Sequence, residues 1–185
     1  FNPVAFLSSP CLLDAIDAIG VKPGEQWLEL GTGCGMAALY AARKGANVIA
    51  TDVTKGAVAC AKENASGKGL QHNLMVVRSD LFATLPAQRF DVILFHPPYF
   101  AGAPRDDFDR AWRYGDLPQR FARELGEHLA PGGRAILLLS SNGDCGAYLD
   151  ALASEGFRIE IVFEKELIVE RVVAYSVQGA SPREQ

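Results

Sequence analysis

The stretch Glu29-Leu30-Gly31-Thr32-Gly33-Cys34-Gly35 decides how this chain is expected to fold. It ends the short apolar run 26–30, which is typical of a buried strand, and leads into the alanine- and leucine-rich run 35–44, which is typical of a helix. Glycines at alternate positions allow a sharp turn and a close approach to a ligand, because no Cβ atom stands in the way. The stretch therefore predicts a ligand-binding loop between a strand and a helix, with a tight turn that binds nothing as the alternative.

Strand-like and helix-like segments alternate on both sides of this loop. A first helix, with Ser8 or Ser9 as its N-cap, is predicted by apolar residues at helical spacing, namely Leu12, Leu13, Ile16 and Ile19. Further strands are expected at 47–51, 74–78, 90–95 and 135–139. Further helices are expected at 54–66, 117–129 and 145–154, with a turn at 130–133. This alternation is typical of a parallel sheet covered by helices on both faces.

The last two strand-like runs, 157–163 and 167–177, break the alternation. Only residues 164–166 separate them, and this link is too short for the crossover that two parallel strands need. They are therefore expected to form an antiparallel hairpin at the end of an otherwise parallel sheet.

Composition and charge limit the class of protein. A length of 185 residues predicts one domain over 1–178, with a flexible tail at 179–185. No apolar run approaches the roughly 18 residues that span a membrane, and no signal peptide is evident, so a cytoplasmic protein without a membrane partner is expected. The net charge of -4 disfavours a nucleic-acid partner, although a local basic patch is left open. The four cysteines form no CxxC pair, and the sequence offers no convincing set of metal ligands; the oligomeric state is not indicated.

An acidic residue at the end of the next strand adds a second half to the predicted site. Asp52 lies 17 residues beyond Gly35, where its carboxylate can accept hydrogen bonds from both ribose hydroxyls of a nucleoside. The dinucleotide fingerprint needs a third small residue where this chain has Met36, which disfavours NAD. Glu29 in a buried strand requires a positive or hydrogen-bonding partner, because an isolated buried carboxylate is costly.

These residues resemble motif I of the class I methyltransferases, which bind S-adenosylmethionine. The resemblance implies a Rossmann-like α/β fold with a mostly parallel seven-stranded sheet and a C-terminal antiparallel hairpin. It also implies that Asp52 and Val53 bind the ribose, that Asp80 and Leu81 flank the adenine, and that the loop holds the methionine part through Glu29, Gly31, Thr32, Gly33 and Gly35. An exposed aspartate that caps a turn is the alternative for Asp80.

A second motif, His96-Pro97-Pro98-Tyr99, follows the strand 90–95 at the edge where open α/β sheets bind ligands. Prolines leave the nearby carbonyls free to accept hydrogen bonds, because they carry no N–H group. The segment resembles the Asn/Asp-Pro-Pro-Tyr/Phe motif of amino-group methyltransferases. That resemblance implies that His96 and Pro97 accept hydrogen bonds from the target NH2 group, that His96 also contacts the cofactor, and that Tyr99 packs on the substrate. Histidine replaces the usual Asn or Asp, and it can accept when neutral or take a proton near pH 6.5.

The connection 100–117 is long for a compact domain, which is typical of a specificity loop. Trp112 and Tyr114 are candidates to cover the substrate. The arginines Arg105, Arg110 and Arg113 either meet an acidic group or pair with Asp106, Asp107 and Asp109 on a solvated face.

Three functions stay open from these patterns. The Pro-Pro-Tyr segment with the loop around Trp112 is similar to the HemK-type protein glutamine methyltransferases, which implies N-methylation of a protein glutamine or of a small amino-bearing molecule. An RNA or DNA base amino-methyltransferase is the first alternative. A non-catalytic domain that retains the fold and binds a partner is the second, and the intact Gly31, Gly33, Gly35 and Asp52 argue against it.

Overall fold

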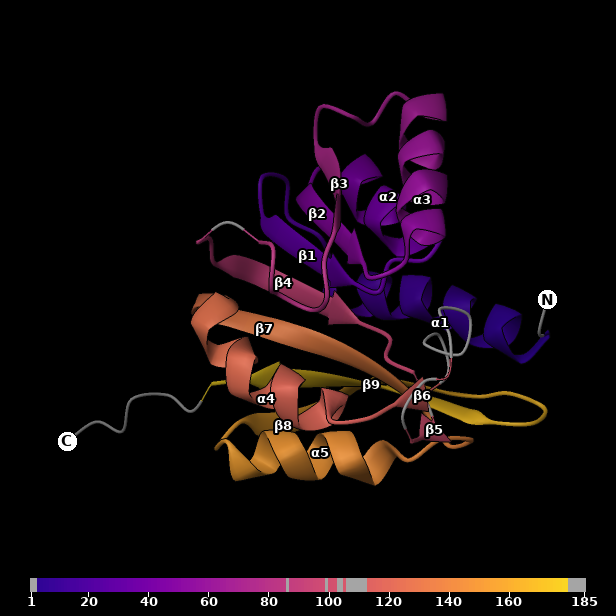
Figure 1. Ribbon diagram of the computed structural model, residues 1–185, viewed down its shortest axis with the longest axis vertical. Coiled ribbons are helices and arrows are strands. Elements are labelled where there is room, and N and C mark those ends of the chain that lie inside the picture. Colours follow the sequence, from indigo (N-terminus) through magenta and orange to yellow (C-terminus); the bar gives the residue numbers. More distant parts are fainter. Residues whose placement is uncertain (1–2, 86, 99, 103–104, 106–112, 180–185) are drawn as a thin grey trace.

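A seven-stranded sheet forms the centre of the computed structural model, which describes residues 3–85, 87–98, 100–102, 105 and 113–179 (Figure 1). The strand order is β3-β2-β1-β4-β7-β9-β8. The strands are β1 (Gln26–Leu30), β2 (Asn47–Asp52), β3 (Leu74–Arg78), β4 (Phe90–Phe95), β7 (Leu129–Ser140), β8 (Arg158–Glu166) and β9 (Arg171–Gln178). All pairs are parallel except β7–β9 and β8–β9, which are antiparallel. The predicted fold class, including the terminal hairpin, is confirmed.

Helices cover both faces of the sheet, as the alternating pattern predicted. They are α1 (Pro3–Ile19), α2 (Met36–Arg43), α3 (Lys55–Gly67), α4 (Leu117–His128) and α5 (Cys145–Ser154). Helices α1 to α3 pack with side chains such as Trp27 and Leu138 on one face, and α4 and α5 pack with Leu28 and Leu137 on the other. Neighbouring residues of one strand enter different cores because successive side chains point to opposite faces.

The parallel register brings three sequence-distant segments to one edge of the sheet. Leu30 at the end of β1 is opposite Thr51 of β2 and Phe95 of β4. Gly31 and His96, which follow β1 and β4, therefore leave the sheet beside Asp52, the last residue of β2. This is the carboxyl edge, where ligands bind in open α/β sheets.

Two local expectations were wrong in their boundaries. Helix α1 begins at Pro3, so Ser8 and Ser9 lie inside the helix and are not its N-cap. Residues 130–133, expected as a turn, belong to β7, but the register jumps from Phe90–Leu129 to Val92–Arg134. The four residues between these pairs are opposite only one residue of β4, so the turn signal marks a bulge inside a strand.

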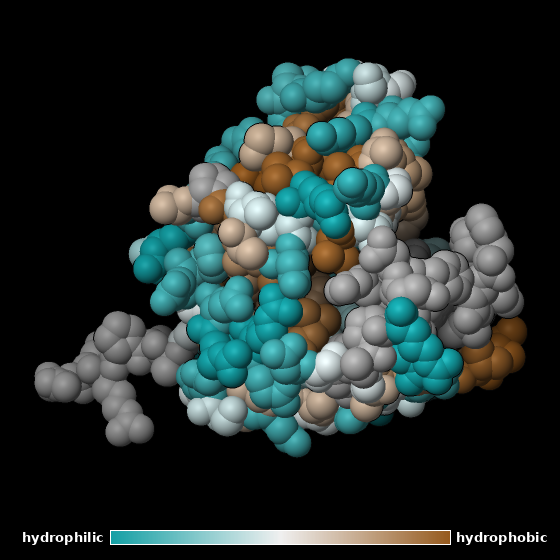
Figure 2. Space-filling view, viewed as in Figure 1, coloured by the Kyte–Doolittle hydropathy of each residue, from teal (hydrophilic) through white to brown (hydrophobic). Residues whose placement is uncertain are grey.

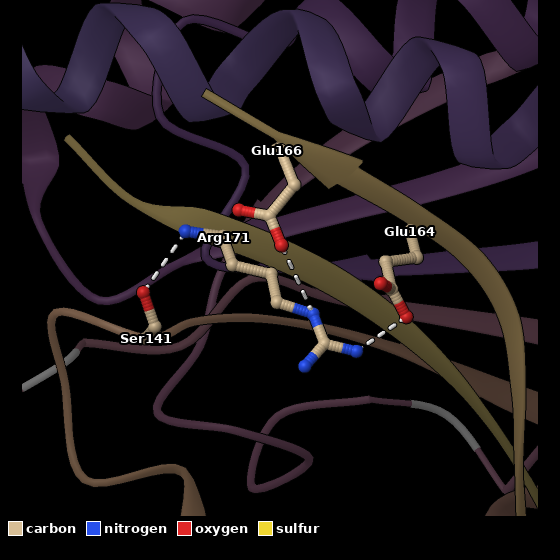
Figure 3. Close-up of polar contacts among 4 residues, drawn as sticks. All are labelled: Ser141, Glu164, Glu166 and Arg171. Atoms are coloured by element: carbon tan, nitrogen blue, oxygen red, sulfur yellow. Dashed lines mark hydrogen bonds and ion pairs between the residues drawn. The ribbon is translucent and has the colours of Figure 1, made fainter. Parts of the chain in front are cut away.

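The terminal hairpin also differs from its predicted boundaries. Residues 164–166, expected as the link, are the end of β8, and the turn is made by residues 167–170, which were expected to be strand. Glu166 pairs with Arg171 across the hairpin, and the Arg171 guanidinium contacts Glu164 and Glu166 (Figure 3). Oppositely charged residues can pair across two exposed antiparallel strands and still form the hydrogen bonds of a sheet. The charged residues 164–166 were therefore a poor indicator of a turn.

No helix in the described part of the chain is long and apolar enough to cross a membrane. Of the predicted flexible tail, only Gly179 is described, and it follows β9 without regular structure; residues 180–185 lie outside the described residues. The domain limits stay predictions.

Candidate active site

A cavity of about 370 Å³ opens at the carboxyl edge of the sheet. It brings together segments that follow four different strands, β1, β2, β3 and β4. Its lining residues are Leu30, Gly31, Gly33, Thr51, Asp52, Val53, Thr54, Ala57, Ser79, Asp80, Leu81, Phe95, His96, Pro98 and Leu117. Most of the residues that the sequence assigned to the cofactor therefore share one cavity. The sequence did not assign the other lining residues to the cofactor, because only the fold brings them to this edge: Leu30, Thr51, Thr54, Ala57, Ser79, Phe95, Pro98 and Leu117.

The glycine loop requires its glycines. Gly31, Gly33 and Gly35 have φ angles of 67°, 57° and 84°, a left-handed region that other residues rarely adopt. The amide of Thr32 donates to Thr51 O at 2.8 Å, and the amide of Gly35 donates to Thr32 O at 2.9 Å. These bonds fix the loop between the ends of β1 and β2, so its shape exists without a ligand.

Glu29 supports the loop from beneath. Its side chain is only 5% exposed, and its Oε2 accepts hydrogen bonds from Thr32 Oγ1 at 2.5 Å and from the Ala38 amide at 2.9 Å. These are the hydrogen-bonding partners that the sequence required for this acid. Burial raises the pKa of Glu29 to about 7, although both hydrogen bonds oppose the shift. The cavity is lined by the next residues, Leu30 and Gly31, so Glu29 holds the loop to α2.

The raised pKa of Glu29 predicts how stability depends on pH. Between its ordinary pKa of 4.5 and about 7, the folded protein binds more protons at this group than the unfolded chain, so the free energy of unfolding falls as pH rises. At roughly 1.4 kcal/mol per pKa unit, the loss is about 3 kcal/mol. Urea denaturation at pH 5 and pH 8 measures it. Glu29→Gln is expected to remove this pH dependence. The control Glu63→Gln, which changes an exposed residue of α3, should retain it. If the stability of Glu29→Gln depends on pH as in the wild type, Glu29 is not the group responsible.

Asp52 is held at the cavity by both of its oxygens. Oδ2 accepts from the Gly33 amide at 3.1 Å, and Oδ1 accepts from the Thr54 amide and hydroxyl at 2.9 and 3.0 Å. Thr54 in turn caps α3, since its Oγ1 accepts from the Ala57 amide at 3.3 Å. A carboxylate offers about four acceptor sites, so this half-buried group, which already accepts three bonds, retains capacity for one ligand hydroxyl.

The segment after β3 forms another wall of the cavity. Leu81 is buried and has a φ of 48°, a left-handed conformation that is rare for a leucine. Such strain costs roughly 1–3 kcal/mol and is frequent at ligand sites, and no sequence pattern predicted it. The turn at this point is capped by Ser79, whose Oγ accepts from the Thr84 amide at 3.1 Å. The Asp80 side chain instead forms an ion pair with Arg120 at 3.2 Å.

His96 and the prolines after it lie where β4 ends. His96 is half-buried and lines the cavity, Pro97 is buried, and Pro98 also lines the cavity. Burial lowers the pKa of His96 to about 4, so its imidazole is neutral at physiological pH. Protonation near pH 6.5, one of the two behaviours expected from the sequence, is therefore wrong. Tyr99 lies outside the described residues.

Pro98 faces a second, smaller hollow. That hollow is lined by Pro98 together with the end of β7 and the start of α5, including Ser140, Cys145 and Tyr148. The segment after β4 therefore separates the main cavity from the region around the end of β7.

Little of the loop 100–117 is described. β5 (Phe100–Ala101) and β6 (Arg113–Tyr114) pair with each other, and Arg113 Nη1 donates to Ala101 O at 3.1 Å. Arg105 is exposed. Trp112, Arg110, Asp106, Asp107 and Asp109 lie outside the described residues, and for Tyr114 only the backbone is described, so their roles stay predictions. Within the described ranges, no group of three or more His, Cys, Asp or Glu side chains is placed to hold a metal ion.

Comparison with known proteins agrees with this geometry. The profile of the methyltransferase small domain family matches residues 7–166. A Methanocaldococcus jannaschii protein, provisionally named a protein N5-glutamine methyltransferase, is 33% identical over 143 residues, covering 72% of this chain and 71% of that protein. The release factor glutamine methyltransferase of Cereibacter sphaeroides is 38% identical over 137 residues, covering 66% of this chain and 49% of that protein. This chain thus spans about half the length of the second relative.

A solved structure shows the same fold. The T. thermophilus 16S rRNA N2 methyltransferase, in complex with AdoMet and guanosine, superposes with a TM-score of 0.73 at 24% identity, covering 93% of this chain and 43% of that one. Its likeness concerns the fold, whereas the family match extends over most of the sequence, including the glycine loop and the segment 96–99. The chain therefore belongs to the methyltransferase small domain family and is a methyltransferase with S-adenosylmethionine as its cofactor.

Proposed function

We propose that the cofactor occupies the cavity at the carboxyl edge of the sheet. In this arrangement Gly31, Thr32, Gly33 and Gly35 surround the methionine part, with Glu29 fixing their loop. Asp52 and Val53 receive the ribose, and Asp80 and Leu81 flank the adenine. The observation that carries the proposal is the shared lining: Gly31, Asp52, Leu81 and His96 face one cavity although they lie at or after the ends of four different strands.

We propose that the reaction is N-methylation of the side-chain amide of a protein glutamine. Two relatives carry glutamine methyltransferase in their names, and the segment His96 to Tyr99 has the acceptor-rich character that an NH2 group requires. The HemK-like assignment rests on this segment. A cytoplasmic location follows from the sequence alone and stays part of the proposal.

The proposed roles follow from the chemistry of an amide. When bound, the cofactor supplies an electrophilic methyl group on a sulfonium sulfur. The amide nitrogen is a weak nucleophile, because its lone pair is delocalised, and its N–H groups must be directed to acceptors so that the nitrogen faces the methyl group. A neutral His96 imidazole nitrogen and the Pro97 carbonyl are such acceptors, and Tyr99 packs on the acceptor side chain. In the transfer, the S–CH3 bond would break as the N–CH3 bond forms, and the displaced N–H proton would pass to water.

The low pKa of His96 gives this proposal a test. His96→Ala is expected to reduce kcat by about 30-fold, because one acceptor is lost, whereas His96→Asn retains an acceptor and most of the activity. In the wild type, kcat should not fall between pH 8 and pH 5 on account of His96, since the pKa lies near 4. A titration of kcat near pH 6.5 that disappears in His96→Asn would contradict the neutral role.

The substrate class is tested with labelled cofactor. Purified release factor, 16S rRNA and small primary amides are offered in separate reactions, and transfer to the release factor is expected. Transfer to RNA alone would favour the nucleic-acid alternative, which the net charge of -4 does not support. Cofactor binding without transfer to any acceptor class would favour the non-catalytic alternative.

A further inference from the structure

The turn of the β8–β9 hairpin has a composition that neither the fold nor the turn requires. It consists of residues 167–170, and Ile168 and Val169 at its tip are 101% and 58% exposed. Tight turns ordinarily use Gly, Pro, Asn, Asp or Ser, each of which favours the turn conformation. Two β-branched apolar side chains in solvent contribute nothing to the core, so their presence requires another explanation.

The flanks of this turn are anchored, so the tip has a fixed base. Glu170 is 4% exposed, and its carboxylate accepts a short hydrogen bond from Ser140 Oγ at the end of β7. The Leu167 amide donates to Glu170 O at 2.8 Å. Arg171 exchanges two bonds with Ser141. Its amide donates to Ser141 Oγ at 2.9 Å (Figure 3), and its carbonyl accepts from the Ser141 amide at 2.8 Å. A fixed apolar tip loses little conformational entropy on binding.

The base of the tip is continuous with the segment that we assign to the methyl acceptor. Ser140, which holds Glu170, lines the same small hollow as Pro98, and Pro98 also lines the cofactor cavity. In Figure 1 the hairpin projects past β5 and β6 at the same edge of the sheet. The tip and His96 therefore lie at the same edge of the sheet, where one macromolecule can contact both.

The charged groups beside the tip include more carboxylates than cations. Lys165 Nζ pairs with Asp14 of α1 at 2.8 Å, and Arg171 pairs with Glu164 at 2.5 Å and with Glu166 at 3.6 Å, so two cations face three carboxylates. This excess of negative charge repels a phosphate backbone, so the apolar tip suits an apolar protein surface better. Figure 2 shows hydrophobic atoms at the right-hand margin, where the hairpin ends in Figure 1.

The small area of the tip favours a partner that also binds the protein at a second place. Two side chains present far less than the roughly 800 Å² per partner of a standard stable interface, so they cannot sustain a dimer by themselves. A substrate protein that is already bound through its acceptor side chain needs only such a small additional contact.

We propose that Ile168 and Val169 form a docking point for an apolar patch on the protein substrate, away from the methylated side chain. This inference rests on the proposed function, and it assigns to the hairpin the discrimination between a whole protein and a peptide. A short peptide that carries only the acceptor residue reaches His96 without touching the tip.

The experiment compares two substrates and two variants. Ile168→Ser combined with Val169→Ser is expected to raise KM for purified release factor by about tenfold, with kcat unchanged. KM for a short synthetic peptide around the acceptor glutamine should stay as in the wild type. The control Ile161→Ser removes an apolar side chain of β8 that is 55% exposed and distant from the turn, and it should change neither KM.

Further measurements distinguish a failure of the docking point from a failure of the proposed function. Cofactor affinity and the melting temperature should match the wild type, since the tip touches neither the cavity nor the core. Equal KM values for the double variant and the wild type on release factor would overturn the docking point while leaving the proposed function intact. Wild-type dimers in sedimentation velocity that dissociate in the double variant would identify the occupant as a second copy and also overturn it. If the wild type neither methylates release factor nor binds it in surface plasmon resonance, the proposed function itself fails.

Discussion

Asp52→Ala is expected to weaken the binding of S-adenosylmethionine by roughly 100-fold. Among the side chains of this site, we expect its removal to cause the largest loss of cofactor affinity. The Asp52 carboxylate lines the cavity and retains acceptor capacity beyond the bonds from Gly33 and Thr54. A hydrogen bond to a charged acceptor contributes about 1.5–3 kcal/mol, so a ribose hydroxyl on the remaining acceptor site of this carboxylate gives about 3 kcal/mol at the upper end of that range. Isothermal titration calorimetry measures the change.

Asp52 also supports the glycine loop, so the indirect effect needs its own control. Thr54→Ala removes the α3 cap and the hydroxyl bond to Asp52, but it keeps the amide bond and leaves the carboxylate in place. It is expected to cost about 1 kcal/mol of stability and to change affinity by less than about threefold. Asp17→Ala, which removes an exposed acid paired with Lys44, should change nothing at the cavity. A dissociation constant for folded Asp52→Ala within threefold of the wild type would remove Asp52 from the site.

Gly35→Val is expected to abolish cofactor binding and to destabilise the fold by about 4 kcal/mol or more. Gly35 has a φ of 84°, which is strained for a β-branched residue. A Cβ atom at this position also lies 3.1 Å from the Cβ atom of Ala61, on the helix α3 that covers the loop. Each effect costs roughly 1–3 kcal/mol, and together they displace either the loop or α3. Urea denaturation and calorimetry with the cofactor measure both losses.

A matched pair of glycines separates the two causes. Gly20 has a φ of 72° and open space around its Cβ position, so Gly20→Ala reports the backbone cost alone, about 1 kcal/mol. Gly35→Ala should cost about 3 kcal/mol. Ala61→Gly alone should cost about 1 kcal/mol, because glycine destabilises the interior of α3, and the double variant should be about 1 kcal/mol more stable than the sum of the two losses, because the closest contact disappears. Equal losses in Gly20→Ala and Gly35→Ala would mean that α3 does not hold the loop.

Much of the fold was predictable because hydrophobic pattern and turn chemistry agreed. Three independent signals indicate the same strand–loop–helix unit: the run Gln26–Leu30, the glycines after it and the alanine-rich helix. The predictions were wrong where two signals competed. Ile168 and Val169 look like strand residues but form a turn, because the charged residues before them pair across the hairpin.

The site was predictable in its residue types and less so in its chemistry. Gly31, Asp52 and His96 follow predicted parallel strands, so their meeting at one edge follows from the topology. The neutral state of His96 and the raised pKa of Glu29 depend on burial by residues distant in sequence, which no local pattern contains. The same holds for the left-handed Leu81, whose conformation depends on tertiary packing.

The placement of β9 bears on how the protein is made. This strand lies between β7 and β8, although both precede it in the chain. During synthesis, the edge of β7 therefore stays without its neighbour until residues 171–178 have left the ribosome, and β8 has no sheet to join before then. An unpaired strand edge is a template for aggregation. We therefore expect that β9 must insert rapidly, or that a chaperone must protect the edge of β7, during synthesis.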